Sequence, residues 1–442
     1  MRPGARMSAA IEVLTAIETG HRPAAVALAD WGRAHRFAGS GDRAAIGNLV
    51  YDALRRKRSL GVRMGSDAPR GLVLAAALES LSLSPEALAR ELETTPHAPE
   101  VPTADEMAGL AAVAAAAATP GAAAASETFA DADIPDWLVP SLVRALGADR
   151  LVEEGRALAG RAPVDVRVNT LKADREKVLK ALDRFGAQPM ALSPIGVRIP
   201  PPRGGARAPH VEGETGHGKG WFEVQDEGSQ IAAAMADAGP RQQVLDICAG
   251  AGGKTLALAA RMQNTGQIYA YDTDRRQLRP IFERLKRAGA RNVQVLNGGD
   301  RAGLEALGAR FDLVLVDAPC TGSGTWRRRP DAKWRLKPEA LAERLRDQED
   351  VLTLAAPLVK PGGRLVYVTC SLLPEENGER IAAFLAANPE FAIEPYADVW
   401  RRTLPGEPPQ SADGREDGLL LTPARHATDG FYIASLVRTA AA

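Results

Sequence analysis

The sequence predicts an α/β protein in which a doubly wound parallel sheet follows a small α/β module and an amino-terminal helical region. Three observations predict this architecture. Short apolar runs alternate with helical segments from residue 243 onward, a glycine-rich turn follows the first of these runs, and residues 11–90 repeat apolar side chains three and four apart. With 442 residues, 45% of them hydrophobic, the chain is long enough for two or three domains.

The amino-terminal region, residues 1–130, is predicted to be a helical bundle. Apolar residues within 11–17 and 46–54 recur at helical spacing. Residues 94–133 are rich in Ala, Pro, Thr and Glu with few large apolar anchors, which favours a linker or a peripheral helix. The basic run 55–58 is typical of a helix end, where cations suit the helix dipole.

The middle region, residues 135–235, is predicted to be a small α/β module. Its strand, helix and strand are expected at 164–168, 174–185 and 196–199. Its loops carry the basic residues Arg203, Arg207 and Lys219. Such a module serves either as an RNA-binding platform or as packing support.

In the third region, residues 236–442, predicted strands alternate with predicted helices as they do in a doubly wound parallel sheet. Its strands are expected at 244–248, 267–272, 293–296, 311–317 and 364–369. A helix over 339–359 connects the last two strands, so we expect them to lie side by side, about 5 Å apart. Ligands of such sheets bind at the carboxyl ends of the strands.

The turn Cys248-Ala-Gly-Ala-Gly-Gly-Lys254 opens a helix after the first strand. Glycines let the backbone approach a ligand closely, and a helix amino terminus favours a negative group. A Walker A loop is excluded, because its first glycine would fall at Cys248. Asp272 ends the second strand 22 positions after Gly250, the spacing at which a carboxylate takes ribose hydroxyls. This pattern favours an adenosine-type cofactor, either a nicotinamide or S-adenosylmethionine, over a turn that serves only tight packing.

Two of the three cysteines, Cys320 and Cys370, follow the last two strands, and Asp317 ends the first of these. Because both cysteines follow the ends of neighbouring strands, we predict that the two thiols face one pocket beside the cofactor. A thiolate that adds to carbon 6 of a pyrimidine makes carbon 5 nucleophilic, a second group then removes the carbon 5 proton, and a carboxyl group stabilises the adduct. We expect the site to lower the thiol pKa or to pass the proton to a partner. The alternative, a small buried residue at a strand end, fits one cysteine better than two.

The overall composition limits which binding partners and which cellular compartment are expected. Basic and acidic residues balance at 55 each, so affinity for a polyanion must come from local patches. Three cysteines and six scattered histidines form neither a disulfide framework nor a zinc motif, so no metal is expected and a reducing cytoplasm fits. The alanine run 111–118 is too short to cross a bilayer, so we expect no membrane role, and a monomer is the default expectation.

The segment 325–337 follows the first thiol and holds six basic residues against one acidic, with Trp326 and Trp334 interleaved. Phosphate neutralisation and ring stacking are common ways to hold unpaired RNA. We therefore predict that this segment contacts RNA at the mouth of the pocket. The alternative is a solvated charged loop.

Several motifs closely resemble the RsmB/NSUN-type RNA cytosine-5 methyltransferases, bacterial RsmB in particular. The matching segments are 167–172, 224–230, 244–254, 317–324, 368–377 and 429–432. The resemblance implies a Rossmann-like class I methyltransferase sheet, S-adenosyl-L-methionine as cofactor and RNA as substrate. One departure is Gly250-Ala251, which stands where the family usually has Ala-Pro and exchanges a fixed φ for a flexible residue. It favours a weaker cofactor affinity with the role of the turn unchanged.

By the same resemblance, Cys370 is the nucleophile that attacks carbon 6, and Cys320 assists breakdown of the adduct. Asp317 reaches the cytosine as well as the cofactor. The cofactor-binding residues implied by the resemblance are Cys248, Ala249, Gly250, Ala251, Gly252, Gly253, Lys254, Asp272, Asp300 and Asp317.

The resemblance also ranks the substrates. Residues 42–51 faintly resemble the NusB-like domain at the front of bacterial RsmB, which favours RNA docking by residues 1–130 and 16S ribosomal RNA as the substrate. Transfer RNA is the alternative substrate. DNA cytosine-5 methyltransferases use a Pro-Cys thiol as nucleophile, so Thr369-Cys370 favours RNA. A small-molecule methyltransferase and a non-catalytic RNA-binding protein of ribosome assembly are the other classes to separate.

Overall fold

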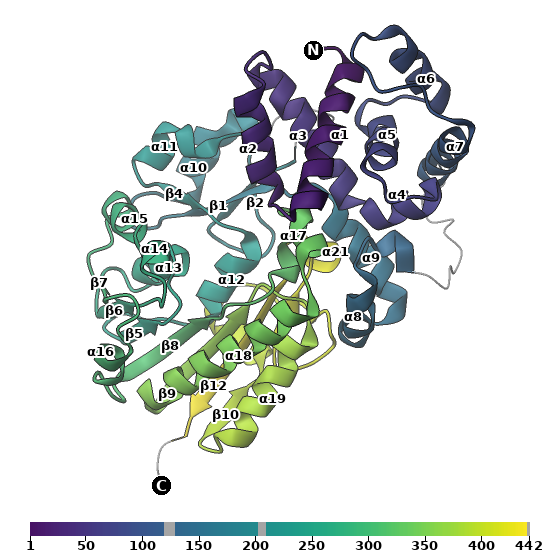
Figure 1. The fold of residues 1–442 in the computed structure, drawn as a ribbon. Helices are drawn as coiled ribbons and strands as arrows, with labels where there is room; N and C mark the ends of the chain where they lie inside the picture. The colour runs from purple at the N-terminus through teal and green to yellow at the C-terminus, as the bar shows by residue number, and fades with distance from the viewer. Residues whose placement is uncertain (119–128, 202–208, 440–442) are drawn as a thin grey trace.

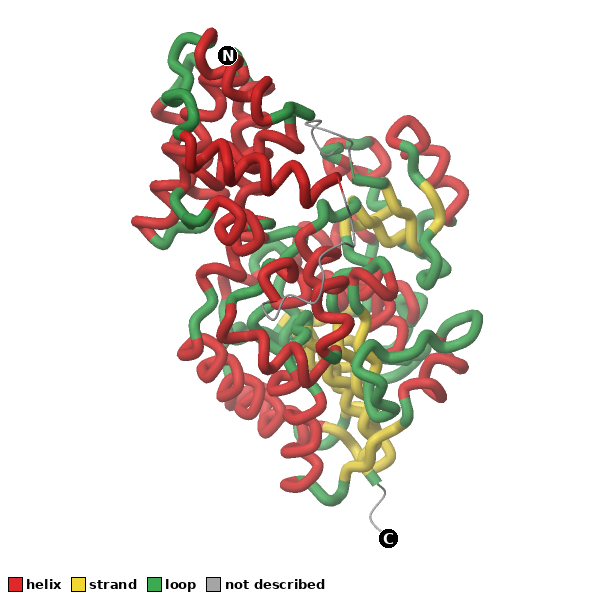
Figure 2. Tube along the Cα trace, turned by 90° about the vertical axis from the view of Figure 1, so that its right-hand side faces the viewer, coloured by secondary structure: helices red, strands yellow, loops and turns green. Residues whose placement is uncertain are grey.

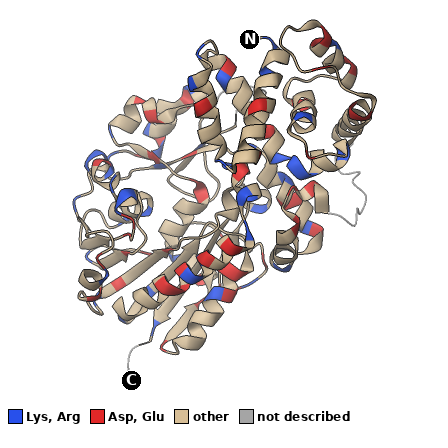
Figure 3. Ribbon diagram, viewed as in Figure 1, with Lys and Arg blue, Asp and Glu red and all other residues tan. Residues whose placement is uncertain are grey.

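The computed structural model describes residues 1–118, 129–201 and 209–439. A helical bundle forms the amino-terminal end of the molecule, and a small and a large sheet follow it along the chain (Figures 1 and 2). Acidic and basic side chains are interspersed over these parts (Figure 3), in keeping with the balanced composition.

Residues 1–118 form a bundle around a buried central helix. The bundle helices are α1 Pro3–Gly20, α2 Ala24–Ala34, α3 Ser40–Arg55, α4 Lys57–Met64, α5 Pro69–Ser80, α6 Pro85–Thr94 and α7 Ala104–Ala118. Every side chain of 71–78 in α5 is buried, because α1, α3, α4 and α7 pack around it. The prediction of a helical region is confirmed, and the basic run 55–58 lies where α3 ends and α4 begins.

The alanine-rich segment contributes a peripheral helix. Helix α7 buries Leu110 and Val113 against the bundle, while most of its alanines are exposed. The remainder of the segment, 119–128, lies outside the described residues.

The middle part contains a four-stranded antiparallel sheet in the order β2-β3-β1-β4. Its strands are β1 Val164–Val168, β2 Gln188–Pro189, β3 Gly196–Ile199 and β4 Phe222–Val224. The elements around it are η1 Phe129–Ala132, η2 Asp136–Leu138, α8 Val139–Leu146, α9 Ala148–Ala159, α10 Arg175–Leu182, η3 Asp183–Phe185, η4 Val211–Gly213 and α11 Thr215–Gly218. Helix α10 packs Val178 and Leu182 against the sheet. The predicted strand, helix and strand are present, and β2 and β4 are additions that were not predicted; Arg203 and Arg207 lie outside the described residues.

The large sheet has the order β10-β12-β9-β8-β5-β6-β7, with β11 paired to β12. Its strands are β5 Gln243–Asp246, β6 Gln267–Ala270, β7 Val293–Val295, β8 Phe311–Asp317, β9 Val359–Thr369, β10 Phe391–Glu394, β11 Leu419–Leu421 and β12 Phe431–Arg438. Strands β5 to β9 are parallel, as predicted, whereas β12 joins β9 in antiparallel fashion. The predicted doubly wound sheet is confirmed, with an antiparallel extension that was not predicted.

Helices cover both faces of this sheet. Successive residues of β8 alternate between the faces: Leu313 and Leu315 share a core with α12, α13 and α20, and Val314 and Val316 share one with α18 and α19. The helical elements of this part are α12 Glu227–Met235, α13 Gly253–Arg261, α14 Arg275–Leu278, α15 Ile281–Ala288, α16 Arg301–Glu305, η5 Ser323–Thr325, α17 Pro330–Arg335, α18 Pro338–Ala355, η6 Ala356–Leu358, η7 Pro374–Glu376, α19 Gly378–Ala387, α20 Tyr396–Thr403 and α21 Pro423–His426.

The topology locates the place for a ligand. Strand β5 lies between β6 and β8, so the chain winds outward from it in both directions. Open α/β sheets bind ligands at this reversal, outside the carboxyl ends of the strands. In the described part of the chain, no single helix is both long and apolar enough to span a membrane; α5 and α6 meet that test only as a pair, bent by 110°.

Candidate active site

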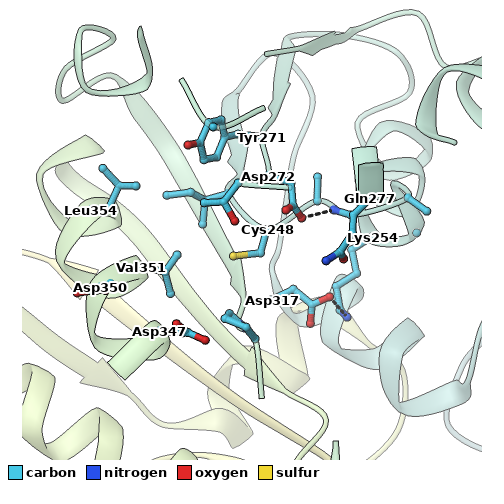
Figure 4. A pocket seen from close by; sticks show the side chains of 18 of the residues that line it. Cys248, Lys254, Tyr271, Asp272, Gln277, Asp317, Asp347, Asp350, Val351 and Leu354 are labelled. Atoms are coloured by element: carbon cyan, nitrogen blue, oxygen red, sulfur yellow. Dashed lines mark hydrogen bonds and ion pairs between the residues drawn. The ribbon is translucent and has the colours of Figure 1, made fainter. Parts of the chain in front are cut away.

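A cavity of about 820 Å³ opens at the carboxyl ends of β5, β6 and β8. The turn after β5 forms one wall, and the labelled side chains of Figure 4 converge on the cavity from β6, β8 and α18. Helix α18 contributes Asp347, Val351 and Leu354, which are spaced three and four apart and share one helical face. The cavity has the size of a small-molecule site.

Two glycines of the turn after β5 adopt the left-handed backbone conformation. Gly250 has φ +50° and Gly252 has φ +83°, which residues with a Cβ adopt only with strain. The Gly250 N–H donates to Oδ2 of Asp272 at 2.9 Å, so the carboxylate at the end of β6 fixes the turn. A Cβ at Gly252 would lie 2.5 Å from Cγ1 of Ile281, so this glycine also permits close packing against α15.

Most of the predicted cofactor-binding residues line the cavity. Those that do are Cys248, Ala249, Gly250, Ala251, Gly253, Lys254, Asp272 and Asp317. Gly252 does not line it and instead faces Ile281. The Asp300 side chain does not line it either: it caps α16 by accepting from the Gly303 N–H at 2.9 Å, while its neighbours Gly299 and Arg301 reach the cavity.

Several lining residues escaped the sequence analysis. They are Gln225, Ser229, Ile247, Tyr271, Thr273, Gln277, Gly299, Arg301, Pro319, Arg344, Asp347, Asp350, Val351 and Leu354. Tyr271 directly precedes Asp272, so its place beside the predicted ribose carboxylate was within reach of sequence reasoning. The residues of α18 carried a helical pattern, but nothing in it indicates which face looks into a cavity.

Two ion pairs join residues that line the cavity: Arg344 with Asp347 at 3.0 Å, and Lys254 with Asp317. Lys254 donates from Nζ to Oδ2 of Asp317 at 2.7 Å, and its side chain is almost fully buried. Beneath it, Asp246 accepts a hydrogen bond from the Thr255 hydroxyl at 2.7 Å, and burial raises the pKa of Asp246 to about 7. Burial and nearby carboxylates raise the pKa of the Cys248 thiol well above its usual value, so this cysteine stays neutral at neutral pH.

The two strand-end thiols meet each other, but neither residue lines the cavity. Strands β8 and β9 are parallel neighbours, and the sulfurs of Cys320 and Cys370 lie 3.5 Å apart. The predicted juxtaposition is therefore present. Both side chains are half-buried, so neither sulfur is sealed in the core. Asp317 and Pro319, which precede Cys320, line the cavity and connect it to the thiol pair.

The thiol pair differs from the expectation of a lowered pKa in one respect. The hydrogen bond with Cys370, burial and the charge of Glu376 raise the pKa of Cys320 well above its usual value. Cys320 is thus a neutral thiol in contact with Cys370. Of the two predicted routes, lowering the pKa does not hold for Cys320.

The two tryptophans of the segment 325–337 do not form an exposed stacking surface, so that part of the prediction is wrong. Arg329, Arg335 and Lys337 are exposed, and an RNA contact by these cations stays a prediction. Trp326 is 1% exposed, and Trp334 donates from Nε1 to the carbonyl of Leu54 at 2.6 Å. Lys333, also 1% exposed, donates to the carbonyls of Arg55 and Asp133, both at 2.7 Å. The segment joins the helical bundle to the catalytic sheet, and its tryptophans bury area against protein.

The first cations of this segment are used in the same way. Arg327 and Arg328 both form ion pairs with Asp226, at 3.2 and 2.9 Å, and both pair with Asp429. These carboxylates come from the start of α12 and from the turn before β12, so the arginines tie three distant segments together. Arg327 is buried and its charge is neutralised inside the protein, whereas Arg328 is ion-paired but exposed.

Among the described residues, no group of three or more His, Cys, Asp or Glu side chains is arranged to hold a metal ion.

The order of the large sheet, with the glycine turn and acidic strand end at its reversal, defines the class of Rossmann-like methyltransferases. A model described as 16S rRNA methyltransferase RsmB/F matches residues 233–437, and a model of the RsmF/B-like ferredoxin-like domain matches 134–203. The chain belongs to this RsmB/F family.

Individual relatives agree with the family. The chain is 34% identical over 309 residues to ribosomal RNA small subunit methyltransferase B of Salmonella typhi, a match that covers 69% of this chain. It is 32% identical over 306 residues to the probable ribosomal RNA small subunit methyltransferase B of Synechocystis, which covers 68% of this chain. Each match spans 66% of the relative's length. The crystal structure of PH0851 superposes with a TM-score of 0.71 at 26% identity and covers 99% of both chains.

Proposed function

We propose that this protein transfers a methyl group from S-adenosyl-L-methionine to carbon 5 of a cytosine in RNA, with 16S ribosomal RNA as the substrate. The observation that carries the proposal is the contact between the sulfurs of Cys320 and Cys370, 3.5 Å apart, where Cys320 directly follows the cavity-lining residue Pro319. Formation of a covalent pyrimidine adduct requires a nucleophile at carbon 6, and its breakdown requires loss of the carbon 5 proton to a base with a second group that assists departure of the sulfur.

The cavity fits the cofactor by the chemistry of its lining. Asp272 ends β6 where a carboxylate meets ribose hydroxyls, and Tyr271 and Leu354 offer apolar surface for a purine. The carboxylate of Asp317 supplies negative charge where a cationic donor needs it. When bound, S-adenosyl-L-methionine supplies the electrophilic methyl group.

The residues of the chain then take distinct roles. The sulfur of Cys370 bonds to carbon 6 of the cytosine, and the ring becomes an enamine with a nucleophilic carbon 5. Asp317, held by Lys254, is placed to hydrogen-bond the ring and stabilise the adduct. For release, the carbon 5 proton passes to a base such as solvent water, the electrons of that C–H bond restore the ring double bond, and Cys370 leaves as a thiolate. The neutral thiol of Cys320 can stabilise that thiolate by a hydrogen bond.

The test is the Cys370→Ala variant, assayed with isotopically labelled S-adenosyl-L-methionine and 16S ribosomal RNA. We expect methyl transfer to be abolished while RNA affinity, measured by filter binding, is retained. Undiminished product would refute the nucleophile assignment. If wild-type protein binds RNA but transfers no methyl group to any RNA, the non-catalytic assembly protein is the better description.

The same assay separates the alternative substrates. Transfer RNA, DNA and free nucleosides replace ribosomal RNA in parallel reactions, and bisulfite-type mapping locates the modified cytosine. Preferred methylation of transfer RNA would favour the second substrate of the family resemblance. RNA docking by residues 1–130, domain boundaries near residues 130 and 236, a monomeric state and a cytoplasmic location stay predictions.

A further inference from the structure

Glu376 is a buried acid that the proposed reaction does not use. It ends η7, and its side chain has no exposed surface. Within the described residues it forms no ion pair, although an isolated buried carboxylate is costly. Burial raises the pKa of Glu376 accordingly. The hydrogen bonds of the Glu376 carboxyl group explain why this acid is buried.

The carboxyl group receives four hydrogen bonds. Its Oε1 accepts from the Thr321 N–H at 2.8 Å and from Nε2 of Gln348 at 3.0 Å. Its Oε2 accepts from the hydroxyls of Thr321 and Ser371. Each oxygen of the carboxyl group therefore accepts two hydrogen bonds.

The donors belong to the two loops that carry the thiols. Thr321 directly follows Cys320, and Ser371 directly follows Cys370. Gln348 adds a second tie, because the same Nε2 donates to the carbonyl of Pro319 at 3.0 Å. One carboxyl group thus holds the residue after each cysteine, and through Gln348 it is linked to the residue before one of them.

The two loops also touch directly. Oγ of Ser371 lies 3.0 Å from Oγ of Ser323 and 3.5 Å from Oγ1 of Thr321. The Gly324 N–H donates to the carbonyl of Cys370 at 2.9 Å, and the Leu372 N–H donates to Oγ of Ser323 at 2.8 Å. These two bonds are made by η5 itself, whereas Glu376 holds the backbone N–H of Thr321, two residues before η5. Removal of Glu376 would therefore loosen the loop of Cys320 without separating the strands.

From this network we infer that Glu376 is a positioning residue, which sets the separation of the Cys320 and Cys370 sulfurs by binding the residue after each of them. The inference rests on the proposed function, because the separation matters only if both thiols act on one ring. Displacements of about 1 Å at a reacting group lower rates by as much as roughly a hundredfold. Glu376 touches neither sulfur, so it positions them through the loops, in addition to the effect of its charge on the pKa of Cys320.

The test compares Glu376→Ala and Glu376→Gln with Glu375→Gln as a matched control. Glu375 is the adjacent acid, but its side chain pairs with Arg144 and Ser141 and reaches neither thiol loop. The first measurement is independent of RNA: the oxidant diamide takes two hydrogen atoms from the thiols and leaves a disulfide, scored by mass spectrometry of peptides. The rate of this closure reports the sulfur separation in each variant.

We expect closure in Glu376→Ala to be roughly tenfold slower than in wild type, an intermediate rate in Glu376→Gln, and no change in Glu375→Gln. The kcat for RNA should fall about tenfold to a hundredfold in Glu376→Ala, with the affinity for S-adenosyl-L-methionine within about twofold of wild type. Unchanged closure and unchanged kcat would overturn the inference. If Glu376→Ala does not fold, Thr321→Val, which removes only the hydroxyl contact, carries the same comparison.

The two readouts keep this inference apart from the proposed function. If wild type transfers no methyl group yet closes its disulfide quickly, and Glu376→Ala closes it slowly, the proposed function fails and the positioning role stands. If wild type is active and both proteins close at one rate, the positioning role fails alone.

Discussion

The turn after β5 offers the sharpest test of how the cavity is built, through the Gly252→Ala variant. A Cβ at this position would lie 2.5 Å from Cγ1 and 2.9 Å from Cδ1 of Ile281, and the backbone φ is +83°. An alanine in left-handed backbone costs roughly 1–2 kcal/mol, and overpacking of a buried contact costs roughly 1–3 kcal/mol. The variant should therefore lose about 2–5 kcal/mol, a large part of an ordinary domain's stability.

The assay is urea unfolding of the cofactor-free protein, followed by calorimetric titration with S-adenosyl-L-methionine. Gly252→Ala should unfold at lower urea and bind the cofactor more weakly, because the turn must shift its N–H groups to relieve the contact with Ile281. Gly253→Ala is the control: its φ is not left-handed, and its Cβ would lie 3.7 Å from Nε2 of Gln225, an ordinary contact. We expect it to change stability by less than about 1 kcal/mol. Equal unfolding midpoints for the two variants would refute this reasoning.

Two further predictions concern the thiols and the junction with the bundle. In Cys320→Ala a covalent RNA adduct through Cys370 should accumulate on denaturing gels; normal turnover without adduct would exclude a role in release. Burial lowers the pKa of Lys333 from 10.5 to about 8, so the folded protein holds fewer protons than the unfolded chain between these values, and its stability rises with pH across that window. Lys333→Met should lack this rise when urea unfolding is repeated from pH 7.5 to 10.5, and identical slopes in both proteins would contradict the buried ammonium.

Much of the large sheet and its site followed from local pattern. Apolar runs of strand length separated by helical segments leave few topologies open, because parallel connections are short and right-handed. That rule places the carboxyl ends of β5, β6, β8 and β9 at one edge, and with them the turn at Gly250, the acid Asp272 and both thiols. The antiparallel strands β10, β11 and β12 escaped prediction because their apolar runs are short or lie at the very end of the chain.

The segment 325–337 shows where pattern fails. Alternating cations and tryptophans suit an RNA surface and a buried junction equally well, because both need flat apolar rings flanked by hydrogen-bond donors. Trp334 and Lys333 lie at the junction because they donate hydrogen bonds to the carbonyls of Leu54 and Arg55, respectively. These partners lie more than 270 residues away in sequence, so no local window contains them.

The sequence by itself determined the fold class, the turn at the head of α13 and the placement of two thiols at neighbouring strand ends, because periodicity and connection rules act over short stretches of chain. Tertiary structure alone decided that the two sulfurs lie 3.5 Å apart, that Asp300 caps a helix, and that one buried carboxyl group, Glu376, binds both thiol loops. Those outcomes depend on side chains that meet only after the sheet has formed, and on desolvation that no single segment determines.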